Sequence, residues 1–249
     1  IGSISQLNKD TLLVDIWEEL KLISKKNGIY VIYIQLLFLS ELNTEFIKKV
    51  FTLDYLKKVI EHYNIASVRK PSWRSLLAQV IARVFAKLPS IQKNQLILHL
   101  INLLDHSFND FKKNTEAIDL ELKIRYLIQL CIQLHLYNEE NLVQLIIIKL
   151  TQTIKEVDRL QEITMQFEKE ERSKGINNNQ IFRHSFYTKH QNAIVELVNT
   201  INEFLDILNY TDIEILQKYK PSLEQYLQPD LFNGTFLYRI QLILQRLDS

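Results

Sequence analysis

The chain has 249 residues, of which 47% are hydrophobic and 10% aromatic, and its formal charge at pH 7 is +1. This composition is too apolar for a disordered chain, and the balanced charge provides no overall field that would attract nucleic acid or an anionic membrane. Only four glycines and four prolines occur, and these residues form most of the turns that sheets and long loops need. We therefore expect an all-α protein whose helices are joined by short polar turns.

Apolar residues recur at helical spacing along almost the whole chain. Asn8 or Asp10 is suited to cap a first helix, which Asn27-Gly28 would end, and a second helix follows over 29–42. Its longest apolar run, 29–39, is shorter than the roughly 18–20 residues that span a bilayer, so a buried core helix is expected there. Further helices are predicted from residue 44 past residue 59, and over 73–88, 91–106, 124–136, 139–172, 188–208 and 229–247.

Short three-residue turns of similar composition join these predicted helices. The third residue of each turn is of a type that commonly caps the next helix. From Thr44 to Ser90 is 46 positions, from Ser90 to Asn138 is 48, and from Asn138 to Thr211 is 73. A period in this range is typical of stacked helical hairpins, so we predict an α-solenoid of about nine or ten helices, similar to HEAT or octotricopeptide arrays. A compact irregular bundle is the alternative.

The predicted organisation has three parts within one continuous domain. An N-terminal helical-repeat region covers 1–172, an exposed Asn-rich loop insertion covers 173–187, and a C-terminal hairpin with an end helix covers 188–249. The charged run from Glu168 to Arg172 is most simply a solvated helix end, although it would also suit an extension that docks on a partner.

Residue patterns typical of catalysis are not found in this sequence. Glycine-rich phosphate loops, nucleophile elbows and zinc-binding HExxH motifs do not occur. Cys131 and His135 stand four residues apart on a predicted helix, as a thiol–imidazole pair would require, but the apolar neighbours of Cys131 favour simple burial. We expect no catalytic centre, no cofactor and no metal site, and an enzyme with a non-local site is a third, minor hypothesis.

Two clusters combine cations with aromatic rings, as RNA-contacting surfaces do. Cations neutralise phosphate, and aromatic side chains stack on unpaired bases. Capping and surface packing is the competing interpretation of both clusters. The candidate RNA contacts are Arg69, Lys70, Trp73 and Arg74 at a helix start, and Arg183, His184, Tyr187, Lys189 and His190 after the Asn-rich segment.

The stretch Leu134-His135-Leu136-Tyr137-Asn138-Glu139-Glu140-Asn141-Leu142 resembles a turn that recurs in octotricopeptide, heptatricopeptide and FAST-kinase-like helical-repeat proteins. In those proteins a leucine-rich helix end meets a short polar turn, and an acidic helix follows. The segment 209–216 is a looser match. The resemblance implies an organellar, RNA-associated protein without an enzymatic centre.

Two functional hypotheses follow for this chain. The first is a non-catalytic helical-repeat subunit of a mitochondrial ribonucleoprotein such as the mitoribosome, contacting RNA and neighbouring proteins. The second is a HEAT-like scaffold in a cytosolic or membrane-associated complex, without nucleic acid. A single cysteine excludes an internal disulfide and favours a reducing compartment or the mitochondrial matrix. The start at Ile1 would fit a cleaved organellar presequence, and equally a recombinant truncation or a disordered tail.

Overall fold

A computed structural model describes residues 52–67, 71–113, 118–227 and 235–248, together with 11, 14–16, 18 and 19. Every regular element within these ranges is a helix. The prediction of an all-α fold is therefore confirmed for the described part of the chain. The first two predicted helices lie almost entirely outside the described residues, whereas the solenoid arrangement stays a prediction.

The chain divides into two compact units, Ile1–Asn102 and Leu103–Ser249. In the first unit, α4 (Leu53–Ser67) packs against α5 (Pro71–Ala86). Pro71 stands at the start of α5, where its missing N–H is harmless because the first amides of a helix have no partner within it. The division between the units falls inside α6 (Ser90–Lys113), which continues beyond residue 106, where the predicted helix ends.

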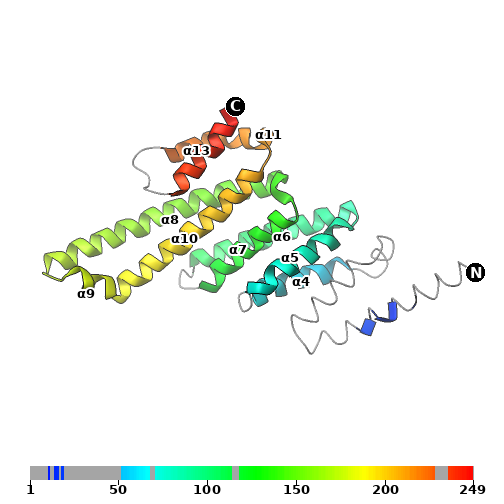
Figure 1. Cartoon of the computed structure of the whole chain (residues 1–249), viewed down its shortest axis with the longest axis horizontal. Helices are drawn as coiled ribbons and strands as arrows, with labels where there is room; N and C mark the ends of the chain where they lie inside the picture. The colour runs from blue at the N-terminus through cyan, green and yellow to red at the C-terminus, as the bar shows by residue number, and fades with distance from the viewer. Residues whose placement is uncertain are drawn as a thin grey trace, which may run out of the picture. The chain divides into compact units, whose positions relative to one another are not determined.

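The second unit is built around α10 (Ser185–Tyr210), which packs against α7 (Ile118–Gln133), α8 (Glu140–Ser173) and α13 (Thr235–Asp248). Figure 1 shows α8 and α10 side by side as a long hairpin whose far end carries α9 (Asn178–Arg183). Short elements complete the unit, one before α8 and the others after α10. They are α11 (Ile213–Leu216), α12 (Lys220–Glu224) and the 3-10 turns η1 (Leu136–Asn138), η2 (Gln217–Tyr219) and η3 (Gln225–Leu227).

Apolar side chains at helical spacing form the core of the second unit. In α10, Ile201, Phe204 and Leu208 are fully buried, and the Phe204 ring lies 5.6 Å from the Phe108 ring of α6. Each buried aliphatic or aromatic side chain stabilises the fold by about 1.5–3 kcal/mol through its removal from water. The facing helices contribute further buried residues, among them Ile124, Leu127 and Ile128 of α7 and Leu142, Ile146, Leu150, Ile154 and Val157 of α8.

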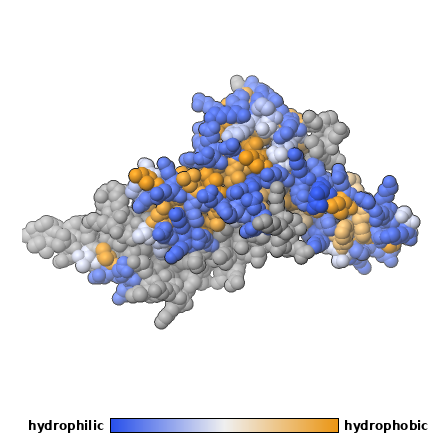
Figure 2. Space-filling view, turned by 180° about the vertical axis from the view of Figure 1, so that it is seen from behind, coloured by the Kyte–Doolittle hydropathy of each residue, from blue (hydrophilic) through white to orange (hydrophobic). Residues whose placement is uncertain are grey.

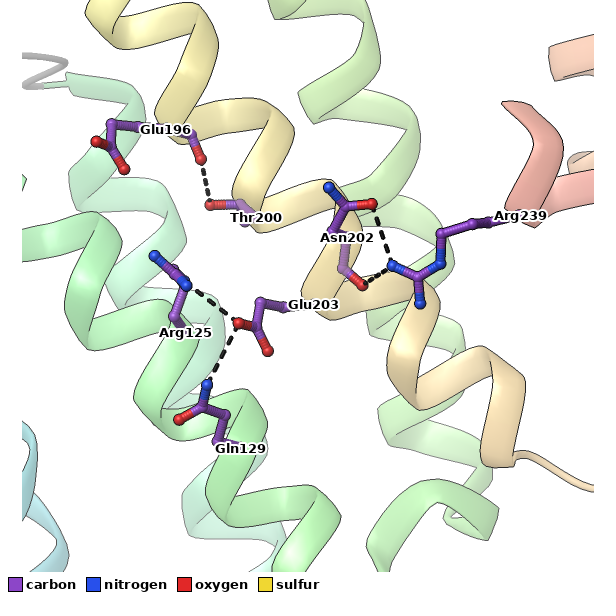
Figure 3. Close-up of polar contacts among 7 residues, drawn as sticks. All are labelled: Arg125, Gln129, Glu196, Thr200, Asn202, Glu203 and Arg239. Carbon is purple, nitrogen blue, oxygen red and sulfur yellow. Dashed lines mark hydrogen bonds and ion pairs between the residues drawn. The ribbon is translucent and has the colours of Figure 1, made fainter. Parts of the chain in front are cut away.

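Polar contacts fix the helices of this unit relative to α10. Figure 3 shows Glu203 of α10 accepting hydrogen bonds from Arg125 Nε and Gln129 Nε2 of α7, both at 3.3 Å. On the other side of α10, Arg239 of α13 donates to the backbone and side-chain oxygens of Asn202 at 3.0 and 3.1 Å. Burial raises the pKa of Glu203 although the Arg125 guanidinium opposes that shift.

A lysine of α8 is buried against α6. The Lys149 ammonium lies 2.6 Å from an Asp105 carboxylate oxygen and 3.2 Å from Asn109 Oδ1. It also stands over the Phe108 ring, 5.2 Å from the centroid. A buried ammonium needs such partners because an unpaired charge inside a protein is strongly destabilising.

Two of the turns that the sequence marked as similar lie in direct contact. Asn138 Nδ2 donates to Asp212 at 2.7 Å, and the Asp212 amide donates to Asn138 Oδ1 at 2.9 Å. The Tyr137 and Tyr210 rings are 5.8 Å apart. The Thr211 hydroxyl donates to the Tyr137 carbonyl at 2.8 Å, so the prediction that it caps the next helix is wrong, and Asp212 holds the cap position.

The predicted exposed loop over 173–187 is wrong in extent. Helix α9 and the start of α10 occupy most of it, and only 174–177 and residue 184 are non-helical. Asn177 accepts from the Gln180 amide while the Gln180 side chain accepts from the Asn177 amide, which is a reciprocal capping box. Asn residues that suggested a loop therefore begin a helix.

Candidate interaction surface at the end of the α8–α10 hairpin

Local sequence features determine how the chain turns at the end of the α8–α10 hairpin. Gly175 adopts a positive φ of 81°, and the Ile176 amide donates to the Glu171 carbonyl at 3.2 Å. This pairing is the glycine-terminated helix end in which the chain turns back on the last carbonyls. Helix α9 then crosses the end of the hairpin, and His184 turns the chain into α10. We call residues 167–190 the hairpin tip.

Aromatic rings gather at the hairpin tip. The Phe186 ring lies 4.9 Å from Phe167 of α8 and 4.1 Å from His190, and His184 packs on Phe167 at 4.9 Å. Phe182 forms a separate pair with Tyr187 at 5.2 Å. Ring pairs at these separations stabilise one another beyond the effect of burial alone. We call these six residues the ring cluster.

Hydrogen bonds fix both histidines of the ring cluster. His184 Nδ1 accepts from the Phe186 amide at 3.2 Å and so caps α10. His190 Nδ1 lies 2.8 Å from the Phe186 carbonyl oxygen, which can only accept, so this nitrogen carries a proton. The Nδ1 atoms of both imidazoles therefore contact the Phe186 backbone, one at its amide and the other at its carbonyl oxygen.

The rings of the cluster are packed in contact and yet open to solvent. Phe182 keeps 46% of its surface exposed and Phe186 keeps 37%. In Figure 2, which views the molecule from behind, the end of the hairpin carries apolar residues bordered by hydrophilic ones. Large apolar side chains that group together on a surface mark contact sites more often than isolated ones do.

Charged side chains around the rings are mostly paired with each other. Arg172 lies 3.1 Å from Glu168, and Lys174 lies 2.7 Å from Glu171. Partial burial raises the pKa of the Tyr187 hydroxyl, and its hydrogen bond to Glu168 adds to that shift. Because carboxylates occupy the same surface as the cations, the tip is not a uniformly basic patch.

One of the two predicted RNA-contact clusters lies where the structure describes the side chains. Arg183 and Lys189 are exposed at the tip, where His184, Tyr187 and His190 belong to the ring cluster. In the other cluster, Arg69 and Lys70 lie outside the described residues. Only the backbone of Trp73 and Arg74 is described, in the first turn of α5.

The three phenylalanines of the ring cluster were not among the residues predicted from the sequence. Phe182, Phe186 and His190 are each four residues apart, a spacing that places side chains on one helix face. That signal was available, but it crosses the junction between α9 and α10. Phe167 comes from α8 and meets the others only through the fold of the hairpin.

Cys131 and His135, the possible thiol–imidazole pair, do not lie on one helix. Helix α7 ends at Gln133, and His135 lies in the turn with φ 56°. Its ring contacts Tyr137 and is exposed, whereas Cys131 is buried in α7. Burial raises the pKa of the Cys131 thiol to about 12, which disfavours the nucleophilic thiolate.

Within the described ranges, no three His, Cys, Asp or Glu residues are grouped as metal ligands would be. The helices described here include none that is both long and apolar enough to cross a bilayer. Comparison with protein-family models, curated proteins and solved structures gives no match to this chain.

Proposed function

We propose that this chain is a non-catalytic helical subunit of a larger assembly, and that the hairpin tip binds a neighbouring protein. The observation that carries the proposal is the exposed ring cluster, with Phe182 and Phe186 open to solvent at the end of a long hairpin. Aromatic side chains that are held rigid before binding lose little conformational freedom on contact, so they make effective anchors in protein interfaces.

The charges at the tip favour a protein partner over RNA. Glu168 and Glu171 lie among the cations and pair with Arg172 and Lys174. A phosphate backbone that approached these rings would meet carboxylates as well as cations. Interfaces between proteins commonly have this arrangement, with an apolar centre and a rim of mixed charge.

A photo-crosslinking residue at position 186 of the full-length protein tests the proposal in the native cell extract. We expect a discrete protein adduct at position 186 and none at position 241, because Gln241 is an exposed residue of α13 away from the tip. Phe182→Asp should remove the adduct by placing a charge within the apolar centre. Equal labelling from positions 186 and 241 would contradict the proposal.

An RNA-contacting subunit of a mitochondrial ribonucleoprotein is the second candidate, and the exposure of Arg183 and Lys189 beside the rings favours it. In that case a 20-nucleotide oligouridine should bind the purified protein. Its affinity should fall with salt by a logarithmic slope of about −0.7 for each cation engaged. Arg183→Glu should weaken this binding, and an RNA adduct at position 186 would decide for this candidate. The mitochondrial location stays a prediction, which imaging of a tagged full-length protein tests.

A further inference from the structure

The α8–α10 hairpin has two ends of different character. Helix α8 begins beside the turn at 136–139 and ends at the tip, whereas α10 runs back from the tip to Tyr210. We call residues 135–141 and 209–219 the hairpin base. With 26 residues, α10 is roughly 39 Å long at 1.5 Å per residue, and the tip and the base lie at its two ends.

The tip carries an excess of positive charge. Between 167 and 190 the chain has five Lys or Arg residues and three Glu residues. The carboxylates Glu168 and Glu171 are engaged by Arg172 and Lys174, whereas Arg183 is exposed at the end of α9. The outward apolar groups are Phe182 and Phe186 of the ring cluster.

The base has the opposite charge and its own exposed apolar groups. It holds four acidic residues and one lysine, Lys218, which pairs with Glu140 at 2.8 Å. Glu139 and Glu214 are exposed there, and Tyr210 and Ile213 keep 56% and 43% of their surfaces exposed.

Arg246 of α13 also reaches the base, but the base keeps its excess of negative charge. The Arg246 guanidinium donates to the backbone carbonyls of Asn209 and Thr211, at 2.5 and 3.3 Å. It is therefore directed at backbone oxygens, and the carboxylates of Glu139 and Glu214 remain exposed to solvent. Tip and base thus combine apolar anchors with charges of opposite sign.

We propose that the partner of the hairpin tip is the hairpin base of a second copy of this chain. The proposal rests on the proposed function, since it identifies the protein that the tip binds. Charge complementarity carries it, because Arg183 would meet carboxylates such as Glu214 while the phenylalanines cover Tyr210 and Ile213. Tip and base are different surfaces, so copies join either head to tail in rings or open chains, or as a two-fold dimer in which each tip meets the base of the other copy.

Sedimentation velocity of the full-length protein from 1 to 100 µM tests this proposal. In 50 mM NaCl we expect mass to grow with concentration beyond that of the monomer, and in 500 mM NaCl the association should weaken because salt screens the rim charges. Arg183→Glu alone and Glu214→Lys alone should each weaken association about tenfold. Lys155→Glu is the control, because Lys155 is exposed in the middle of α8 and should leave association unchanged.

A mixture of the two charge-reversal variants provides the sharpest outcome. The reversed tip of one variant then meets the reversed base of the other, and these two surfaces again have opposite charges. The unaltered tip and base of the two variants also have opposite charges. The mixture should therefore regain the association that each variant alone has lost. A chain that stays monomeric at 100 µM in 50 mM NaCl would overturn the proposal, and so would a mixture that regains nothing. A monomeric chain whose position 186 still crosslinks to a different protein would overturn self-association while retaining the proposed function.

Discussion

Asp158 and Glu162 lie four residues apart on α8 and therefore share a face of that helix. Partial burial raises the pKa of Asp158 from 3.8 to about 6, and the like charge of Glu162 adds to the shift. The Asp158 carboxyl group thus binds its proton more tightly in the folded state than in the unfolded chain. Its ionisation consequently lowers stability as pH rises from about 4 to about 6, and the full cost is present above that range.

Asp158→Asn should therefore raise the melting temperature at pH 7.5 by about 2–4 °C, the shift that roughly 1 kcal/mol produces in a chain of this size. At pH 4 the difference should disappear, because Asp158 of the wild-type protein is then protonated when folded. Thermal denaturation followed by circular dichroism at both pH values measures this. The exposed Asp110 provides a matched Asp→Asn control. A benefit that is equal at pH 4 and pH 7.5 would show that ionisation is not its cause.

Individual residues of the candidate site were predictable only where the residues that they contact lie close by in the sequence. His184, Tyr187 and His190 were found because they lie close together along the chain. Phe167 lies 17 positions before His184 and meets it only because Gly175 reverses the chain and Asn177 begins α9. Contacts across a hairpin depend on its register, which composition and local spacing do not encode.

At the scale of elements, the C-terminal helix α13 is held to α10 by two arginines that lie seven residues apart. Arg239 binds Asn202 and also the Asp206 carboxylate, and Arg246 binds two backbone carbonyls at the end of α10. Seven residues are nearly two helical turns, so both guanidinium groups project from one face of α13. Apolar residues of the same helix, Ile240 and Ile243 among them, are buried.

Replacing both Arg239 and Arg246 by alanine should loosen α13 while α8 stays protected. Hydrogen bonds made by charged groups contribute about 1.5–3 kcal/mol each, so opening of α13 should become at least tenfold more frequent. Hydrogen exchange of the amides over 235–248 measures this opening. Gln241→Ala changes an exposed residue of the same helix and should have no such effect. Exchange that accelerates equally in α8 would mean that the arginines stabilise the whole unit.

Element boundaries were predictable where a strong local signal marks them. Pro71 begins α5, Pro89 directly precedes α6, and the predicted helix over 139–172 corresponds to α8 within one residue at each end. The errors came from weaker signals. Asn109 and the residues after it were predicted to be non-helical, yet α6 includes them up to Lys113, since Asn109 has a partner in Lys149 of α8.

At the scale of the whole molecule, Cys131 reports on the core because it is the only cysteine among 249 residues. It is buried in α7, and burial raises its pKa to about 12. A thiol reagent can reach it only when the surrounding helices open, and the stability typical of folded proteins makes such opening rare. An Ellman reagent at pH 8 should therefore label the native protein at least about a thousandfold more slowly than the protein in 6 M guanidinium.

The rate of this labelling also separates a structural thiol from a reactive one. With a structural thiol, Phe204→Ala should accelerate labelling at least tenfold, because removing a buried ring costs about 3–5 kcal/mol and makes opening more frequent. A reactive thiol would instead be labelled within about tenfold of the unfolded rate, and Phe204→Ala would change little. That second result would contradict the burial described for Cys131 and would reopen a catalytic role for this helix. The first result would agree with an assembly subunit whose functional groups lie on its surface, at the two ends of the α8–α10 hairpin.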